Sequence, residues 1–283
     1  EYDMIKANET IFNFYLTLID SLEKYLSKKH PKCNSSKDMK CYQTAIIQKI
    51  AKMFHSLELL SRNTLDEVSA RCILRGILDN ITTYSFIYQR ENEDELWFRH
   101  YLYALDGFKE YTKNVLVLTK QNDLFFKEES LCYQIIEQTE KKLYHHPFYK
   151  QHESAAKKII KNARWNYESL ENPRSLKYRE MYALVGFESG VSEYFQSYLS
   201  QFVHGMCFSN TSTNSAKLKA VIYESIVLAD KFIQVILQTF HDKEIENHLI
   251  CPEVIQQYLD SIKIDDLAEF TRAMVRKEKV LSI

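Results

Sequence analysis

The sequence predicts an all-α protein, a single multi-helix bundle of about ten helices. Only five Gly and four Pro occur among its 283 residues. Turn-rich β architectures and glycine-dependent phosphate loops need far more of both residue types. Apolar residues also recur at helical spacing through most of the chain, as expected for helices that bury one face. We expect one domain over residues 1–283, with the loop-like segment 165–175 as the candidate internal boundary.

Start and stop signals divide the helices. His30-Pro31 stops the first helix, because the residue before a proline avoids the helical region. Thr64 with Glu67 forms a capping-box pattern, and Asn92 followed by acids starts the next helix. We expect helices over about residues 3–27, 41–62, 64–88, 93–120, 123–144, 151–163, 176–184, 188–204 and 216–240, and two more that begin at Pro252 and Asp265.

The stretch 64–88 is apolar on nearly every side, yet it carries Arg71, Arg75 and Asp79 at four-residue spacing. A helix that is apolar almost all round is usually buried. A buried charge left without its partner costs about 3–5 kcal/mol. We therefore expect an Arg75–Asp79 pair within the helix and a partner for Arg71 on another element. Gly76, on a third side, indicates close approach by a neighbouring helix.

A second polar line runs along the helix expected at 188–204. Glu193, Ser197, Ser200 and His204 stand at offsets 0, 4, 7 and 11, which places them within about 40° of one line. One interpretation is a solvent-exposed face, with His204 favoured by the helix dipole. The other is a stripe that lines a pocket, where Ser200 and His204 share a hydrogen bond. The sequence shows neither the orienting acid nor the oxyanion hole of a serine hydrolase.

A basic segment follows the middle of the chain. Residues 157–179 contain seven Lys or Arg against two acids, with aromatic residues interleaved. Such a segment can hold phosphates and stack bases. The alternative is a solvated basic face with a packed tryptophan. The candidate nucleic-acid contacts are Lys157, Lys161, Arg164, Trp165 and Arg174.

Overall charge and hydropathy limit the classes of partner. The formal net charge of −1 gives no global attraction to nucleic acid or to an anionic membrane, so a partner must bind through a local patch. No run approaches the 18 consecutive apolar residues of a membrane span. We therefore expect no membrane association. Because the chain starts at Glu1 rather than Met, we expect it to have been trimmed or processed.

Cysteine and histidine spacing predicts no metal site and no cofactor. The six cysteines contain no CxxC pair, and neither the histidines near Pro147 nor those near Cys33 show paired zinc spacing. There is no HExxH motif. We expect free thiols in a reducing compartment and a cytoplasmic location.

Two motifs resemble those of an uncharacterised family of all-helical bacterial proteins, a domain of unknown function. An early helix of that family reads roughly A-R-x-x-L-R-x-x-x-E, and a later one Y-x-x-L-S-x-x-V-H-G. The matching residues here are Ala70, Arg71, Leu74 and Arg75, with Asp79 in place of Glu, and then Leu199, Ser200, Val203, His204 and Gly205. The resemblance covers residues 40–240 loosely. It implies a helical fold in which Arg75 and Asp79 face Ser200 and His204.

A more distant resemblance is to the HEPN group of helical nucleases, whose active site is a dimeric pocket built on R-x(4–6)-H. It implies RNA cleavage and a homodimer. No His in this chain has an Arg or Asn at that spacing, since Ser, Tyr and Leu occupy residues 197–199 before His204.

Two functional hypotheses remain open. The first is a non-enzymatic helical binding or regulatory protein, with an unknown protein partner or RNA, in which the polar groups fix the helix register. The second is a ribonuclease-like or nucleotide-handling protein. There Arg71, Arg75 and His204 surround a phosphate, Asp79 orients them, and Ser200 lies at the same site.

Overall fold

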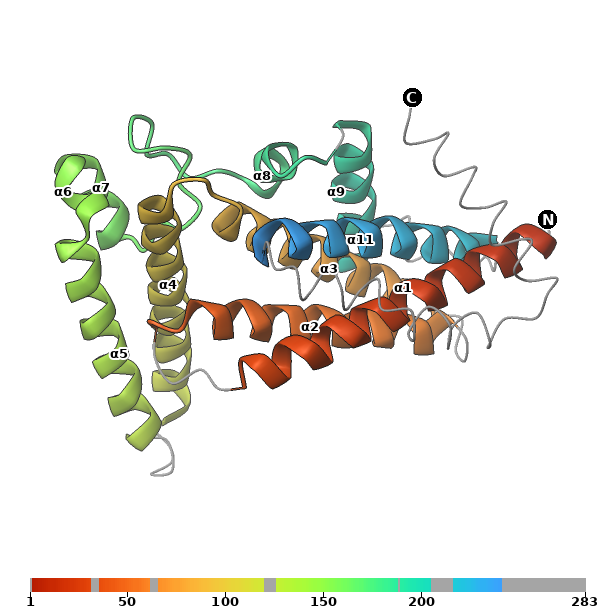
Figure 1. Cartoon of the computed structure of the whole chain (residues 1–283), viewed down its shortest axis with the longest axis horizontal. Coiled ribbons are helices and arrows are strands. Elements are labelled where there is room, and N and C mark those ends of the chain that lie inside the picture. Colours follow the sequence, from red (N-terminus) through yellow and green to blue (C-terminus); the bar gives the residue numbers. More distant parts are fainter. Residues whose placement is uncertain are drawn as a thin grey trace. The chain divides into compact units, whose positions relative to one another are not determined.

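The computed structural model describes residues 2–31, 36–61, 66–119, 126–187, 189–204 and 216–240. Every named element in these ranges is a helix, and the β structure there is an isolated bridge between Tyr167 and Ser175 (Figure 1). The predicted all-α fold class is therefore confirmed. The helices are α1 (Tyr2–Lys29), α2 (Met39–Leu59), α3 (Glu67–Tyr88), α4 (Glu93–Thr119), α5 (Phe126–His145), α6 (Pro147–Gln151), α7 (Glu153–Lys161), α8 (Tyr178–Leu184), α9 (Ser189–Val203) and α11 (Ala216–Phe240).

Capping residues explain where two of these helices begin. The Glu95 amide donates to the Asn92 side chain at 3.0 Å, which confirms the predicted start of α4. At the start of α3, the Ser69 amide donates to Asp66 at 3.0 Å, so Asp66 caps this helix. The Glu67 side chain accepts a hydrogen bond from Arg71. Thr64 lies outside the described residues.

The short helix α6 lies between the predicted helices 123–144 and 151–163 and has no counterpart among the predicted helices. Proline is also well suited to the first position of a helix, where no amide donor is needed. His146 precedes it with an extended backbone and accepts a hydrogen bond from the Phe148 amide. The chain thus restarts a helix at the proline. The predicted helices at Pro252 and Asp265, and the motif residue Gly205, lie outside the described residues.

The chain divides into two compact units. The first comprises residues 1–31, 44–81 and 187–283, and the second comprises residues 32–43 and 82–186. The segment 165–175, which we considered as a boundary, lies inside the second unit. The divisions at 43/44 and 81/82 fall within α2 and α3, so each of these helices contributes residues to both units.

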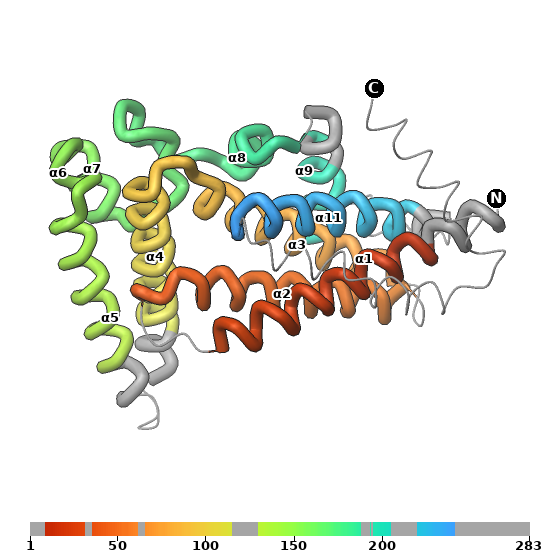
Figure 2. Tube along the Cα trace, in the orientation of Figure 1, coloured from red at the N-terminus to blue at the C-terminus, as the bar shows by residue number. Residues whose placement is uncertain are grey.

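In the first unit, α1 and α11 lie side by side and run in the same direction (Figures 1 and 2). The Tyr15 hydroxyl donates to Asp230 at 2.6 Å, and farther along the rings of His30 and Phe240 approach each other. The Tyr15–Asp230 bond thus links the two helices near their middle. Fully buried side chains from several helices fill the interior, among them Leu22, Ile50, Phe54, Leu74, Ile77, Leu199, Phe232 and Val235.

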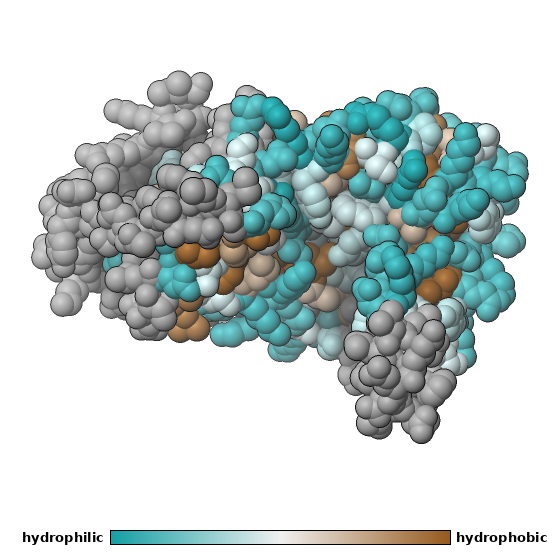
Figure 3. All heavy atoms as spheres, turned by 180° about the vertical axis from the view of Figure 1, so that it is seen from behind, coloured by the Kyte–Doolittle hydropathy of each residue, from teal (hydrophilic) through white to brown (hydrophobic). Residues whose placement is uncertain are grey.

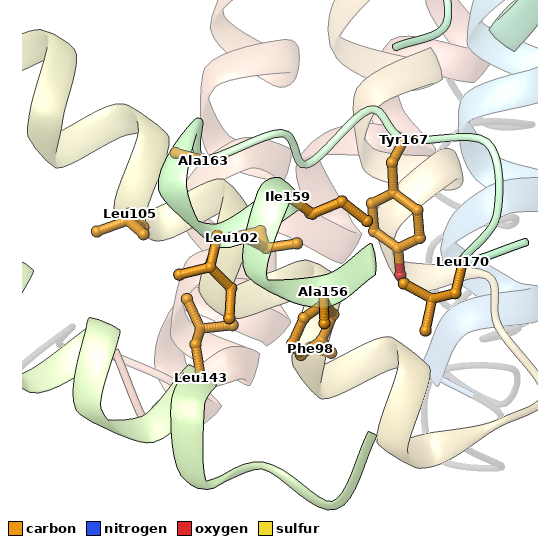
Figure 4. Close-up of a cluster of buried hydrophobic side chains, with 10 residues drawn as sticks. Phe98, Leu102, Leu105, Leu143, Ala156, Ile159, Ala163, Tyr167 and Leu170 are labelled. Atoms are coloured by element: carbon orange, nitrogen blue, oxygen red, sulfur yellow. The ribbon is translucent and has the colours of Figure 1, made fainter. Parts of the chain in front are cut away.

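In the second unit, α4 and α5 form an antiparallel pair, with α6 and α7 next to them (Figure 2). Phe98 and Leu102 of α4 and Leu143 of α5 belong to one apolar cluster, into which α7 inserts Ala156 and Ile159 (Figure 4). The cluster extends to the loop after α7 through Ala163, Tyr167 and Leu170. This packing fixes α7 and the following loop against the α4–α5 pair.

Polar residues dominate the described surface on the face shown in Figure 3, where apolar residues appear in small groups. Isolated exposed apolar side chains are normal on protein surfaces. None of the described helices combines the length and hydropathy needed to span a bilayer.

Candidate functional site

Arg71 lies at the centre of a buried ionic cluster in the first unit. Its side chain is only 1% exposed. It donates to Glu67, one turn earlier on α3, at 2.9 Å and to both oxygens of Glu224 on α11 at 2.8 and 2.7 Å. The predicted partner on another element is thus Glu224. Two carboxylates and one guanidinium share a site that is closed to solvent.

Aromatic rings of α9 cover the same guanidinium. The Arg71 guanidinium carbon lies 4.4 Å from the centre of the Tyr198 ring and 5.3 Å from that of Phe202, distances at which a cation and a ring attract. Burial by itself lowers the pKa of Arg71, but the hydrogen bond and negative charge of Glu224, together with the hydrogen bond to Glu67, outweigh burial and raise it. Arg71 therefore stays charged, and its Nε and Nη1 donors already serve protein acceptors.

Arg75 joins α3 to α9. It donates to Asp79 at 3.1 Å, as predicted, and also to the Ser200 hydroxyl at 3.0 Å and the Gln196 carbonyl at 3.3 Å. Its side chain is 14% exposed and that of Asp79 is 27% exposed. The expected Arg75–Asp79 pair is confirmed, and Arg75 also bonds to the helix that carries Ser200.

His204 does not join this group through its side chain. It is exposed at the end of α9, where its backbone amide donates to the Ser200 carbonyl at 3.0 Å. Within the described part of the chain its ring makes no hydrogen bond. The Ser200 hydroxyl accepts a bond from a cation and has no general base beside it among these residues. This geometry gives no support to nucleophilic catalysis by Ser200.

The rest of the polar line on α9 is a solvent face. Glu193 and Ser197 are exposed, whereas Phe195, Leu199 and Phe202 on the opposite side are buried. The interpretation as a solvent face therefore fits three of the four polar residues. Ser200 is the exception, because it is half-buried beneath Arg75.

The sequence interpretation missed Glu67, Glu224 and Tyr198 as members of the Arg71 cluster. Glu67 was assigned to a capping box. Glu224 had a usable signal, because it lies between core residues Val221 and Leu228 in a strongly apolar helix. An acid in such a position needs a buried cation. Tyr198 had no such signal, since aromatic residues also fill ordinary cores.

In the predicted nucleic-acid segment, the structure separates the cations from the aromatic rings. Lys157, Lys161 and Arg164 are exposed, as expected for phosphate contacts. Arg174 instead pairs with Glu168 at 2.7 Å and with Glu180 at 2.6 Å. Its charge is therefore neutralised locally.

Trp165 is packed rather than presented for stacking. Its indole nitrogen donates to Asp106 at 3.1 Å, and its ring contacts Phe86 and Tyr103 edge to face. The neighbouring Tyr167 is fully buried. The prediction that Trp165 stacks on a nucleic-acid base thus gains no support, and the alternative of a packed tryptophan describes its position.

A buried histidine organises a second polar group, in the second unit. His100 is 0% exposed and faces the Ser36 carbonyl through Nε2 at 2.9 Å and the Tyr88 hydroxyl through Nδ1 at 3.1 Å. Since a carbonyl only accepts, Nε2 carries the proton, and Tyr88 donates to Nδ1. Burial lowers the pKa of His100 to about 4. The ring is therefore neutral near pH 7.

Lys142 and Thr139 of α5 hold the same Ser36 loop. Lys142 donates to the Ser36 hydroxyl at 2.8 Å, and Thr139 lies 3.3 Å from it while donating to the Ile135 carbonyl at 2.7 Å. Hydrogen bonds therefore connect Lys142, Ser36 and Thr139 in a row. Ser36 is buried, so these hydrogen bonds hold the segment before α2 in place and the Ser36 hydroxyl is not presented as a nucleophile.

Metal-binding chemistry finds no support in the described residues, where no three His, Cys, Asp or Glu side chains are grouped suitably. His55 comes nearest, with Asp20 at 2.6 Å and Glu58 at 3.4 Å. These carboxylates face opposite ring nitrogens, so one ion cannot bind all three groups. A shallow depression on α2, lined by Gln48, Lys49, Lys52, Met53 and Ser56 among others, includes none of the predicted site residues.

The cysteines only partly follow the expectation of free thiols. Cys72 and Cys132 are free. Cys41 is disulfide-bonded, so the expectation is wrong for this residue. A disulfide is unusual in a reducing compartment, and it argues against the cytoplasmic location expected from the sequence.

Comparison of the whole chain with protein-family models, curated proteins and solved structures gives no significant match. The fold and the polar clusters define this chain as an all-α protein with an internal ionic cluster.

Proposed function

We propose that this protein is a non-enzymatic helical binding or regulatory protein, in which the polar residues of α3, α9 and α11 fix how these helices pack. One observation carries the proposal: Arg71 is 1% exposed, bonded to two carboxylates and covered by two aromatic rings. A phosphate ligand would need free donors at this position. The Nε and Nη1 donors of the guanidinium are already used in buried ion pairs, and two aromatic rings cover its face.

The same contacts explain why such residues are useful without catalysis. Sliding or rotating α9 or α11 against α3 would separate Arg71 from Glu224, or Arg75 from Ser200. A separated buried charge costs about 3–5 kcal/mol. These contacts thus favour one helix register over shifted registers. Single buried polar residues have the same effect in coiled coils. A fixed helical surface suits a protein that acts by binding a partner.

The alternative is a ribonuclease-like protein with a HEPN-type site. It requires His204 and at least one arginine to approach the same phosphate. Arg71 is enclosed and Arg75 is occupied by Asp79 and Ser200. His204 is exposed and accessible, so it remains the residue through which the alternative can be tested.

The test is an RNA cleavage assay of purified protein with end-labelled single-stranded and hairpin RNA. Wild type, His204→Ala and a matched surface variant, His145→Ala, are compared at equal concentration. We expect no cleavage above buffer for any of them. Cleavage that is present in wild type and His145→Ala but absent in His204→Ala, with an unchanged unfolding midpoint, would overturn the proposal.

We also propose a homodimer and a cytoplasmic location on sequence arguments alone, and the Cys41 disulfide is the observation that opposes this location. Light scattering coupled to gel filtration measures the mass of the assembly directly. Alkylation of thiols in intact cells tests the location, because a protein in a reducing compartment should have Cys41 modified. A fully protected Cys41 would contradict the cytoplasmic location.

A further inference from the structure

We infer that the exposed face of α7 binds the phosphate backbone of a nucleic-acid duplex through charge alone. This inference rests on the proposed function and names the partner. Lys157, Lys158 and Lys161 are exposed on α7, and Arg164 is exposed directly after it. The lysines lie within about 100° of one another around the helix, over a rise of about 6 Å.

The lysines belong to a helix that is held rigidly from behind. Ala156, Ile159 and Ile160 are fully buried in the apolar cluster of the second unit (Figure 4). In the described part of the chain, Lys157, Lys158 and Lys161 have no carboxylate partner. Elsewhere in this unit, exposed lysines do find partners, as Lys141 does with Glu137 at 2.6 Å. The cations of α7 are therefore available to an external anion.

The end of α7 also fixes the position of Arg164. The Arg164 amide donates to the Ile159 carbonyl at 3.0 Å, and the Ala163 amide to the Ile160 carbonyl at 3.0 Å. Ala163 has a positive φ of 47°. These three features form a Schellman motif, which ends the helix in one defined direction. The backbone thus places Arg164 directly after the lysine-bearing helix, where its guanidinium also donates to the Pro173 carbonyl at 3.4 Å.

The type of partner follows from what this surface lacks. Single strands are bound by stacking bases on aromatic side chains, but Trp165 and Tyr167 are engaged internally. Arg174 is neutralised by Glu168 and Glu180. Four cations without aromatic rings match the phosphates of a duplex, which are bound without reading the bases.

The experiment measures binding of the full chain to a 20-base-pair duplex by fluorescence anisotropy over 50–200 mM salt. Four phosphate contacts predict a slope of log affinity against log salt of about −3.6, which is a loss of about 100-fold over this range. Replacing Lys157, Lys158 and Lys161 by Gln should reduce the slope to about −0.9 and weaken binding at least about tenfold at 50 mM salt. DNA and RNA duplexes should bind alike.

A matched control removes the same charge elsewhere in the unit. Lys109, Lys113 and Lys141 pair with Glu140, Glu110 and Glu137, and their triple Gln variant should bind within about twofold of wild type. Equal losses in both triple variants, or no duplex binding by wild type, would overturn the inference. So would tighter binding to the single strand or to polyglutamate. None of these outcomes touches the proposed function, which fails only if RNA is cleaved.

Discussion

At the scale of single residues, Arg71 shows how a charge persists inside an apolar helix bundle. Its ion pairs are shielded from water, so neither partner can be solvated if the other is removed. Exposed pairs behave differently, because water replaces the missing partner and the pair contributes only about 0–1 kcal/mol. Burial therefore decides the effect of a substitution.

We predict that Arg71→Met lowers the free energy of unfolding by about 3–5 kcal/mol, because Glu67 and Glu224 then lie close together without a cation. Adding Glu224→Leu should restore part of this loss. Urea unfolding of the single and double variants measures both effects. Arg174→Met is the control and should change the free energy of unfolding little, since its ion pairs are exposed. Additive losses in the double variant would show that the two residues are not coupled.

His100 makes stability depend on pH. The folded-state pKa of about 4 lies below the ordinary histidine value of 6.5. Between these two pH values His100 is protonated in the unfolded chain but neutral in the folded protein. The free energy of unfolding therefore falls as the pH is lowered from 6.5 to about 4. The loss from this group is about 3 kcal/mol.

We predict that His100→Gln lacks this contribution and loses less stability than wild type over the same range. Denaturant unfolding at several pH values between 4 and 7 measures the difference. His145→Gln changes an exposed histidine of the same unit and should keep the wild-type pH dependence. If His100→Gln and wild type lost stability in parallel, His100 would not be the group that titrates.

At the scale of elements, the loop after α7 depends on an arginine of α4. Arg99 is 1% exposed and donates to the carbonyls of Trp165 at 3.3 Å, Tyr167 at 2.9 Å and Glu168 at 3.2 Å. It also lies 3.8 Å from the Tyr167 ring centre. The segment 165–175, which the sequence suggests as a domain boundary, is thus anchored to α4 by the guanidinium of Arg99.

We predict that Arg99→Met loosens this loop and lowers stability by about 2–4 kcal/mol, because buried carbonyls lose their donors. Hydrogen exchange should speed up at the amides of Glu168 and Leu176, which bond across the loop to Arg174 and Asn166. Arg174→Met, on the exposed side of the same loop, serves as the comparison and should change these rates little. Unchanged exchange rates in Arg99→Met would show that the loop keeps its structure without the Arg99 hydrogen bonds.

At Gly76 the sequence predicts the close approach of another helix but not which helix it is. A Cβ built there would overlap the terminal methyl of Met53 on α2, which agrees with the close helix approach expected from a glycine in a helix. The expectation did not identify the neighbour. Helix periodicity and capping residues are local, whereas the neighbour depends on how distant segments pack.

At the scale of the whole molecule, the continuity of α2 and α3 through both units has a thermodynamic consequence. A substitution that unfolds one unit must also disturb helices that supply residues to the other. Both tryptophans, Trp97 and Trp165, belong to the second unit. Tryptophan fluorescence therefore reports on that unit, and far-UV circular dichroism reports on all helices.

We predict that Arg71→Met, in the first unit, shifts the fluorescence transition together with the circular dichroism transition. The physical reason is cooperativity carried by the two shared helices. Thermal or urea unfolding followed by both signals is the measurement. If circular dichroism shifted alone while fluorescence kept the wild-type midpoint, the units would unfold independently.

The sequence by itself determined the described helices other than the short α6, and most of their ends to within a few residues, because apolar spacing and caps such as Asn92 act locally. It also determined that Arg71 and Arg75 needed partners, since a buried charge cannot remain alone. Only the tertiary structure decided which partners they have. Glu224 is 153 residues away from Arg71 in the chain, and no local pattern encodes a contact over that separation.

Tertiary structure likewise decided the roles of exposed and enclosed residues. Trp165 and Lys157 belong to one basic and aromatic segment in sequence, but packing turns the tryptophan inward and leaves the lysine in solvent. His204 and Ser200 share one helical line, yet only Ser200 meets Arg75. A side chain's accessibility depends on the neighbours that cover it, and those neighbours come from other parts of the chain.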